Sequence, residues 1–167
     1  MDEDVKKWMN KINEIKKGEM DLSRDEDLSI AIMNLISLEE HFYFSAMKTN
    51  NEEYLGMLNS VRELRKKLLG NMVKNPQGEE WCISKHLLAS SMRLLEVGTK
   101  ELSNGKKDSA IIYFNSAFQL YSLFFGINMK LIETKEIKTD VKENSKDKGI
   151  MGKFSLIVKK IVDCCKE

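Results

Sequence analysis

Proline, cysteine and histidine are scarce in this sequence, and charges of the two signs nearly cancel. One proline and nine glycines in 167 residues leave few sites for tight turns, which favours long helices over a β fold. The formal net charge of +1 provides no global attraction for nucleic acid or for an anionic membrane. Three cysteines make no disulfide framework, so we expect a reducing, cytoplasmic compartment.

Several sequence signatures are also missing. The N-terminal sequence MDEDVKKW has no apolar signal region, and no run of about 18 apolar residues follows, so we expect no transmembrane segment. There is no glycine-rich phosphate loop. Neither histidine follows a glutamate by three positions, as the di-metal sites of helical bundles require. These absences favour a protein that is not an enzyme and that carries no cofactor.

What the sequence does contain is helical periodicity over most of its length. Apolar residues recur at i, i+3, i+4 and i+7, and no useful stretch alternates as a strand would. Breaks fall at Gly18, Asn50–Asn51, Asn75–Gly78 and Ser103–Gly105. The pattern predicts an all-α, antiparallel bundle of about four long helices, with a short N-terminal and a tethered C-terminal amphipathic helix. The expected helices span residues 4–17, 25–49, 52–74, 79–102, 108–133 and 150–165.

A change in composition near residue 134 predicts three parts. Residues 1–133 form the expected bundle domain. Residues 134–149 are highly charged, with Ile137 and Val141 as the main apolar side chains, and we expect a flexible linker there. Residues 150–167 contain the C-terminal amphipathic helix. We expect this helix to dock within its own chain, in a homodimer or on a protein partner.

Residues 94–121 have a distinctive spacing of small and aromatic side chains: Gly98, Gly105, Ala110, Phe114 and Ala117. This spacing resembles a single helical hairpin of the tetratricopeptide type, a hairpin similar to that of microtubule-interacting trafficking domains. Leu94 and Glu101 stand where that family has Trp and Tyr, and no second copy lies about 34 residues away. The resemblance implies a tightly packed helix pair around Gly98 and Ala117, and lends slight support to peptide binding.

Two charged residues interrupt apolar stripes on neighbouring expected helices. Glu39 and Arg65 each lie 13 residues from the break near residue 52, so antiparallel pairing places both about 20 Å from that turn. Continuing the same reflection through the later turns brings His86 and Tyr121 to this level. The sequence therefore predicts a buried polar layer of these four side chains. The layer either fixes the register of the helices or binds a small anionic ligand.

The helix expected at 79–102 has two contrasting faces. Trp81, Leu88, Leu95 and Leu102 form a heptad-spaced apolar line that we expect to face the core. The opposite line contains Cys82, His86 and Arg93, which we interpret as a solvent-facing side. Cys82 and His86, at i and i+4, supply two metal ligands where zinc needs three or four, so we predict no metal site.

Our sequence-based interpretation is a helical interaction or small-ligand-binding module with a buried Glu–Arg layer. Arg62, Cys82 and Arg93 are included as neighbours of that layer. One alternative is a metal- or thiol-dependent enzyme centred on Cys82 and His86. Another is a nucleic-acid-associated protein that uses the cationic run Arg62–Lys67, although the near-zero net charge argues against nucleic acid.

Overall fold

The computed structural model describes residues 6, 9–10, 13–14, 17 and 22–131, and within them it contains four long helices and no strand. The all-α prediction is confirmed for this part of the chain. The expected helix at 4–17 falls largely outside the described residues, and the linker at 134–149 and the helix at 150–165 lie wholly outside them. The helices are α2 (Ser23–Thr49), α3 (Glu53–Met72), α4 (Glu80–Ser103) and α5 (Lys107–Asn128).

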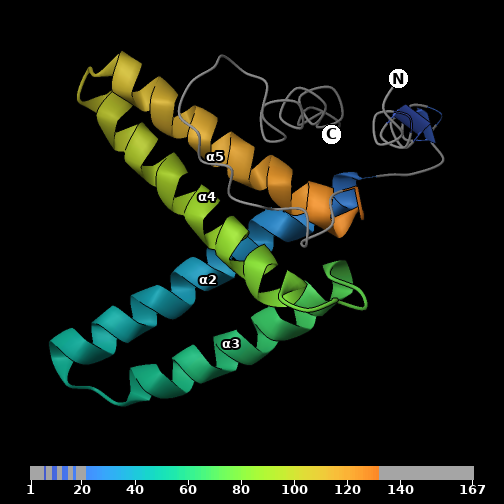
Figure 1. Ribbon diagram of the computed structural model, residues 1–167. Coiled ribbons are helices and arrows are strands. Elements are labelled where there is room, and N and C mark those ends of the chain that lie inside the picture. The colour runs from blue at the N-terminus through green and yellow to red at the C-terminus, as the bar shows by residue number, and fades with distance from the viewer. Residues whose placement is uncertain (1–5, 7–8, 11–12, 15–16, 18–21, 132–167) are drawn as a thin grey trace.

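Consecutive helices pair as two antiparallel hairpins, α2 with α3 and α4 with α5 (Figure 1). The two hairpins cross, and at the crossing α4 packs against α2. Beyond the crossing the tips of both hairpins point to the same side of the molecule and diverge (Figure 1). α4 contacts the first hairpin mainly through α2. It also meets α3 near the end of that helix, where the Trp81 ring lies 3.9 Å from a Cβ position at Gly70.

Residues in the left-handed backbone conformation end helices at the predicted breaks. Asn50, with φ of 52°, terminates α2. Gly105, with φ of 75°, follows α4, and its N–H donates to the carbonyl of Leu102. The N–H of Lys106 reaches back to the carbonyl of Glu101, which completes a Schellman motif. Short, hydrogen-bonded ends of this kind allow the next helix to return immediately.

The end of α5 differs from the sequence prediction of residue 133. The helix ends at Asn128, and Lys130 adopts a φ of 55°. The Leu131 N–H donates to the carbonyl of Gly126 and the Lys130 N–H to that of Ile127, the two bonds of a Schellman motif whose left-handed residue is lysine rather than glycine. Lys130 also contacts Glu80 at the start of α4. This ion pair joins the end of α5 to the start of α4.

The main hydrophobic core contains side chains from both hairpins, as expected of two hairpins that cross. Trp81 and Tyr121 are partly buried and pack against this cluster, and the rings of Tyr121 and Phe125 meet edge to face at 5.1 Å. The buried members are Ile32, Met33, Leu69, Met72, Val73, Leu88, Phe124 and Phe125.

Small side chains line the seam between α4 and α5. Ser84, Ser91 and Gly98 are buried at heptad spacing on α4, and Ser91 Oγ donates to the carbonyl of Ala117 at 2.8 Å. A Cβ atom at Gly98 would lie 2.6 Å from the Phe114 ring. Small residues let two helices approach closely, so the tight packing expected around Gly98 and Ala117 is present.

The α5 helix is also the most apolar of the four. Within the described residues it is the one helix long and apolar enough to cross a membrane by length and composition, and 39% of the relevant window is buried. Core helices of soluble proteins meet the same test. Phe124, Phe125 and Ile127 are buried against other side chains, so the core accounts for much of this apolar character.

Candidate functional site

The predicted contact between Glu39 and Arg65 is present. Arg65 Nε donates to Glu39 Oε1 at 2.7 Å and Nη2 donates to Oε2 at 3.1 Å, which makes a two-point ion pair between α2 and α3. The Arg65 side chain is 3% exposed and that of Glu39 is 13% exposed. Two of the arginine donors and both carboxylate oxygens are thus used between the two helices. The arrangement suits a register-fixing pair.

The other two members of the predicted layer lie elsewhere. His86 is exposed on α4, as the interpretation of its helix line as solvent-facing predicted, so its assignment to the buried layer is wrong. Tyr121 is partly buried, and its hydroxyl shares a hydrogen bond of 2.7 Å with Ser29 Oγ on α2. The register argument failed for α4 because it assumed four helices side by side, whereas the hairpins cross. The crossing brings Tyr121 of α5 to the first half of α2.

A second polar contact between the hairpins lies at the surface. Arg93 of α4 pairs with Glu40 of α2, and both side chains are about half exposed. Ion pairs with such exposure contribute little free energy, because water screens the charges. Arg93 is therefore engaged in a contact between α4 and α2. It is separate from the Glu39–Arg65 pair, which lies between α2 and α3.

The thiol and imidazole proposed for alternative chemistry are both on the surface of α4. Cys82 is a free, exposed cysteine, and His86 is exposed one turn later. Among the described residues, no group of three or more histidine, cysteine, aspartate or glutamate side chains is placed to hold a metal ion. The geometry of this part of the chain therefore offers no support for an enzyme centred on these two residues.

The cationic run on α3 is divided by the fold. Arg62, Lys66 and Lys67 are exposed, but Arg65 is buried with Glu39. Lys66 Nζ also contacts the Glu63 carboxylate at 2.9 Å. Two of the four cations in this run are therefore engaged in ion pairs with neighbouring carboxylates.

Glu80, at the start of α4, has a clearly shifted pKa. Its side chain accepts a hydrogen bond from Lys130 Nζ at 2.5 Å and another from the backbone N–H of Gln77 at 2.9 Å. These bonds, with the lysine charge, hold the pKa of Glu80 below its ordinary value of 4.5, although burial acts in the opposite direction. The group joins three segments, the turn at Gln77, the start of α4 and the end of α5, so we assign it a structural role.

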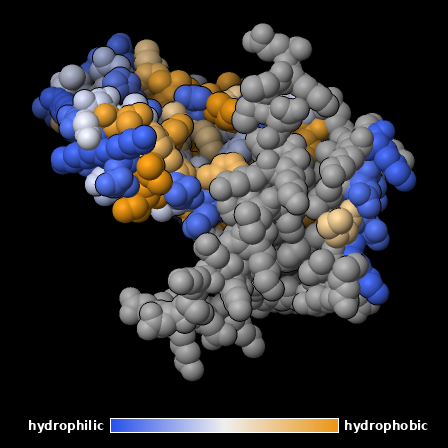
Figure 2. All heavy atoms as spheres, turned by 90° about the horizontal axis from the view of Figure 1, so that it is seen from above, coloured by the Kyte–Doolittle hydropathy of each residue, from blue (hydrophilic) through white to orange (hydrophobic). Residues whose placement is uncertain are grey.

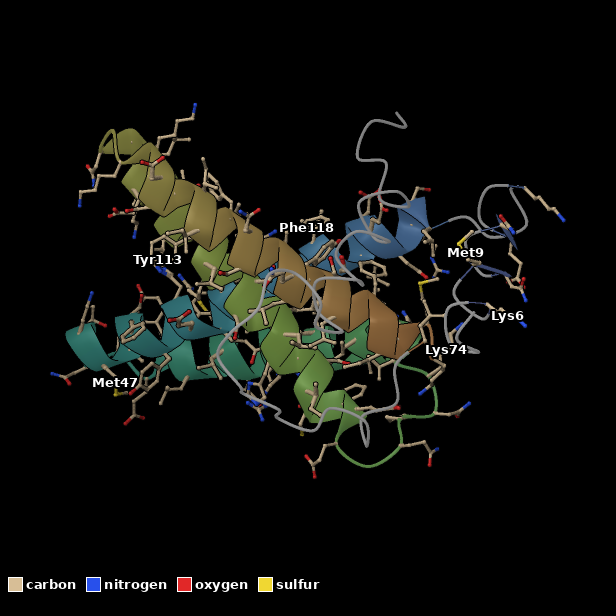
Figure 3. The ribbon with its side chains drawn as sticks, turned by 45° about the horizontal axis from the view of Figure 1, so that its top comes forward. Lys6, Met9, Met47, Lys74, Tyr113 and Phe118 are labelled. Atoms are coloured by element: carbon tan, nitrogen blue, oxygen red, sulfur yellow. The ribbon has the colours of Figure 1, made fainter. Side chains whose placement is uncertain are left out.

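Large apolar side chains are exposed over the outer parts of both hairpins. Figure 2 shows apolar surface interrupting polar surface at the end of the molecule that carries the tips. Met47 of α2 and Tyr113 of α5 lie on this diverging side (Figure 3). Leu95 and Leu102, expected in the core, belong to this surface, because no other described helix packs on that side of α4 beyond the crossing. Most of these side chains lie toward the tips, whereas Ile30 lies next to Ser29 at the crossing. The exposed large apolar residues on the four helices are Ile30, Leu38, Tyr43, Phe44, Met47, Leu55, Met57, Leu64, Leu95, Val97, Leu102, Ile111 and Ile112.

Part of this surface forms an open groove between α2 and α3, which we call the α2/α3 groove. Phe42 stacks on Tyr54 at a centroid distance of 6.3 Å beside it, and Met57 is 49% exposed. The groove could not be predicted from the sequence, because it depends on how the two helices pair. Its lining residues are Phe42, Glu53, Gly56, Met57, Ser60 and Val61.

Comparison with known proteins gives no relative for this chain. No family model, no curated protein and no solved structure matches it. The likeness of residues 94–121 to a tetratricopeptide hairpin thus stays at the level of one helix pair.

Proposed function

We propose that this chain is a helical protein-interaction module rather than an enzyme. The observation that carries the proposal is the set of large apolar side chains exposed on the outer parts of both hairpins. Single exposed apolar residues are ordinary, but their accumulation over one end of a small domain is typical of a surface that another polypeptide covers. An amphipathic helix is the partner whose chemistry suits ridges and grooves between paired helices.

In this proposal the Glu39–Arg65 pair is structural. The charge of Arg65 is neutralised by Glu39 within the hairpin, so Arg65 is not left to bind a small anion. The exposed free thiol of Cys82 supports a reducing, cytoplasmic location.

Chemical cross-linking in the native host, followed by purification and mass spectrometry, tests the interaction. The variant carries Leu102→Lys and Ile112→Lys, since Ile112 is the most exposed of these side chains at 64%. The matched control carries Thr99→Lys and Asn115→Lys, which add the same charge at exposed polar positions of the same hairpin. We expect the control to retain the wild-type partner and the apolar-site variant to lose it at least tenfold, with circular dichroism unchanged in both. Equal capture by all three proteins would refute the proposal.

A further inference from the structure

Gly56 is a helical glycine that no close packing contact among the described residues requires. Gly56 lies inside α3, and a Cβ atom built there would meet no atom within 4 Å. Glycine inside a helix is less stable than alanine, so its presence calls for a compensating contact. Gly98 has such a contact in the ring of Phe114, but no described residue fills the space beside Gly56. Gly56 also lines the α2/α3 groove.

We propose that segment 150–165 of this chain docks as an amphipathic helix in the α2/α3 groove, with its backbone passing close to Gly56. The inference rests on the proposed interaction function and names one groove and its occupant. Met57 and Leu64, which share one side of α3 at i and i+7, are each 49% exposed and provide apolar surface for the docked helix. The apolar side chains that it would bury are Met151, Phe154, Ile157, Val158, Ile161 and Val162.

The length of the chain beyond the described residues fits this occupant. Lys130 contacts Glu80 beside the start of α4, and Trp81 lies 3.9 Å from a Cβ position at Gly70, near the end of α3. The chain therefore leaves the described region close to the end of α3. From Gly70 to Gly56 is about 21 Å along a helix at about 1.5 Å per residue. Residues 132–149 span up to about 60 Å when extended, so the segment reaches the groove of its own chain.

Charge is also complementary. The segment carries Lys153, Lys159 and Lys160 against a single acidic residue, Asp163. At the groove, Glu53 is one of the lining residues and Glu52 beside it is exposed. Lysines flanking an apolar helix face would lie near these carboxylates and favour the segment over an acidic helix.

Thiol labelling of the full-length chain tests the inference. The three native cysteines are replaced by alanine, and one cysteine is introduced as either Ser60→Cys or Arg62→Cys. Residues 60 and 62 are both exposed, but they are about 200° apart around α3 and only residue 60 lines the groove. An empty groove predicts similar maleimide rates for the two thiols. A docked segment predicts labelling at least tenfold slower at residue 60.

Two further substitutions identify the occupant. Phe154→Asp places a charge on the apolar side of the segment and should restore fast labelling at residue 60, whereas the neighbouring control Ser155→Asp should leave it slow. Slowing that is independent of protein concentration supports docking within one chain. Equal labelling rates at residues 60 and 62 would overturn the inference. So would slow labelling at residue 60 that persists in the Phe154→Asp variant. Labelling that becomes slower as the protein concentration rises would also overturn it, because it would indicate docking of a second copy. Because the isolated chain is used, failure here leaves the cross-linking result at Leu102 and Ile112 intact.

Discussion

Arg65 and Glu39 meet side by side, with two arginine nitrogens donating to the two oxygens of one carboxylate. The pair joins α2 to α3 and is nearly sealed from water. A one-residue slip of either helix would rotate one partner by about 100° and separate the charges. The pair therefore selects one register of the first hairpin.

Arg65→Met should destabilise the protein by about 3 kcal/mol, because it leaves the Glu39 carboxylate without its counter-charge. The 13% exposure of Glu39 places the expected cost at the lower end of the range for buried pairs. Arg93→Met is the matched control, since it removes the exposed pair with Glu40 and should cost less than about 1 kcal/mol. Urea unfolding of both variants gives the comparison, and equal losses would contradict a buried role for Arg65.

Gly98→Ala should destabilise by about 1 to 2 kcal/mol, because the clash with the Phe114 ring exceeds the gain in helix propensity. Gly70→Ala is the control, since its Cβ would meet the Trp81 ring at 3.9 Å, an ordinary contact. That variant should be neutral or slightly more stable. Thermal unfolding of the two proteins measures the difference, and a Gly98→Ala protein as stable as wild type would mean that the two helices can separate freely.

The lowered pKa of Glu80 predicts that the protein loses folding stability in acid. Its pKa is lowered in the folded protein, so it binds a proton less readily when folded than when unfolded. It therefore stabilises the fold above the pKa of an unfolded glutamate, and this contribution disappears as the pH falls through the folded pKa. Wild type should lose more stability than Glu80→Gln between neutral pH and about pH 3. Denaturant unfolding at a series of pH values measures this, with Glu63→Gln, at an exposed pair, as a control that should follow wild type.

The helical spacing of apolar residues, together with glycine, proline and asparagine at the breaks, was enough to predict the helices. Asn50 and Gly105 adopt the left-handed conformation that ends a helix, so the breaks near them were readable from residue type. The register of the first hairpin could also be predicted, because the turn between α2 and α3 is short and α3 must therefore pack antiparallel along α2. By contrast, lysine rarely adopts the left-handed conformation that Lys130 has after α5, so its residue type did not indicate a helix end there. The predicted end of α5 was therefore five residues too late.

The position of the second hairpin was the point at which prediction failed. His86 was placed with Arg65 by assuming that α4 runs beside α3, and Leu95 was placed in the core because it lies on the same helical line as Leu88. In the structure, Leu88 is buried at the crossing, whereas Leu95, two turns further along, is exposed. A helical line records which residues share a face, but not how far along the helix a neighbour extends.

The sequence alone determined the helices, their turns and the pairing within the first hairpin, because these depend on residues close together along the chain or joined by one short turn. The tertiary structure decided the crossing of the hairpins, and with it which apolar side chains form the core and which remain at the surface. That choice depends on the packing of side chains from all four helices at once, such as the Ser29–Tyr121 contact, which no local pattern encodes.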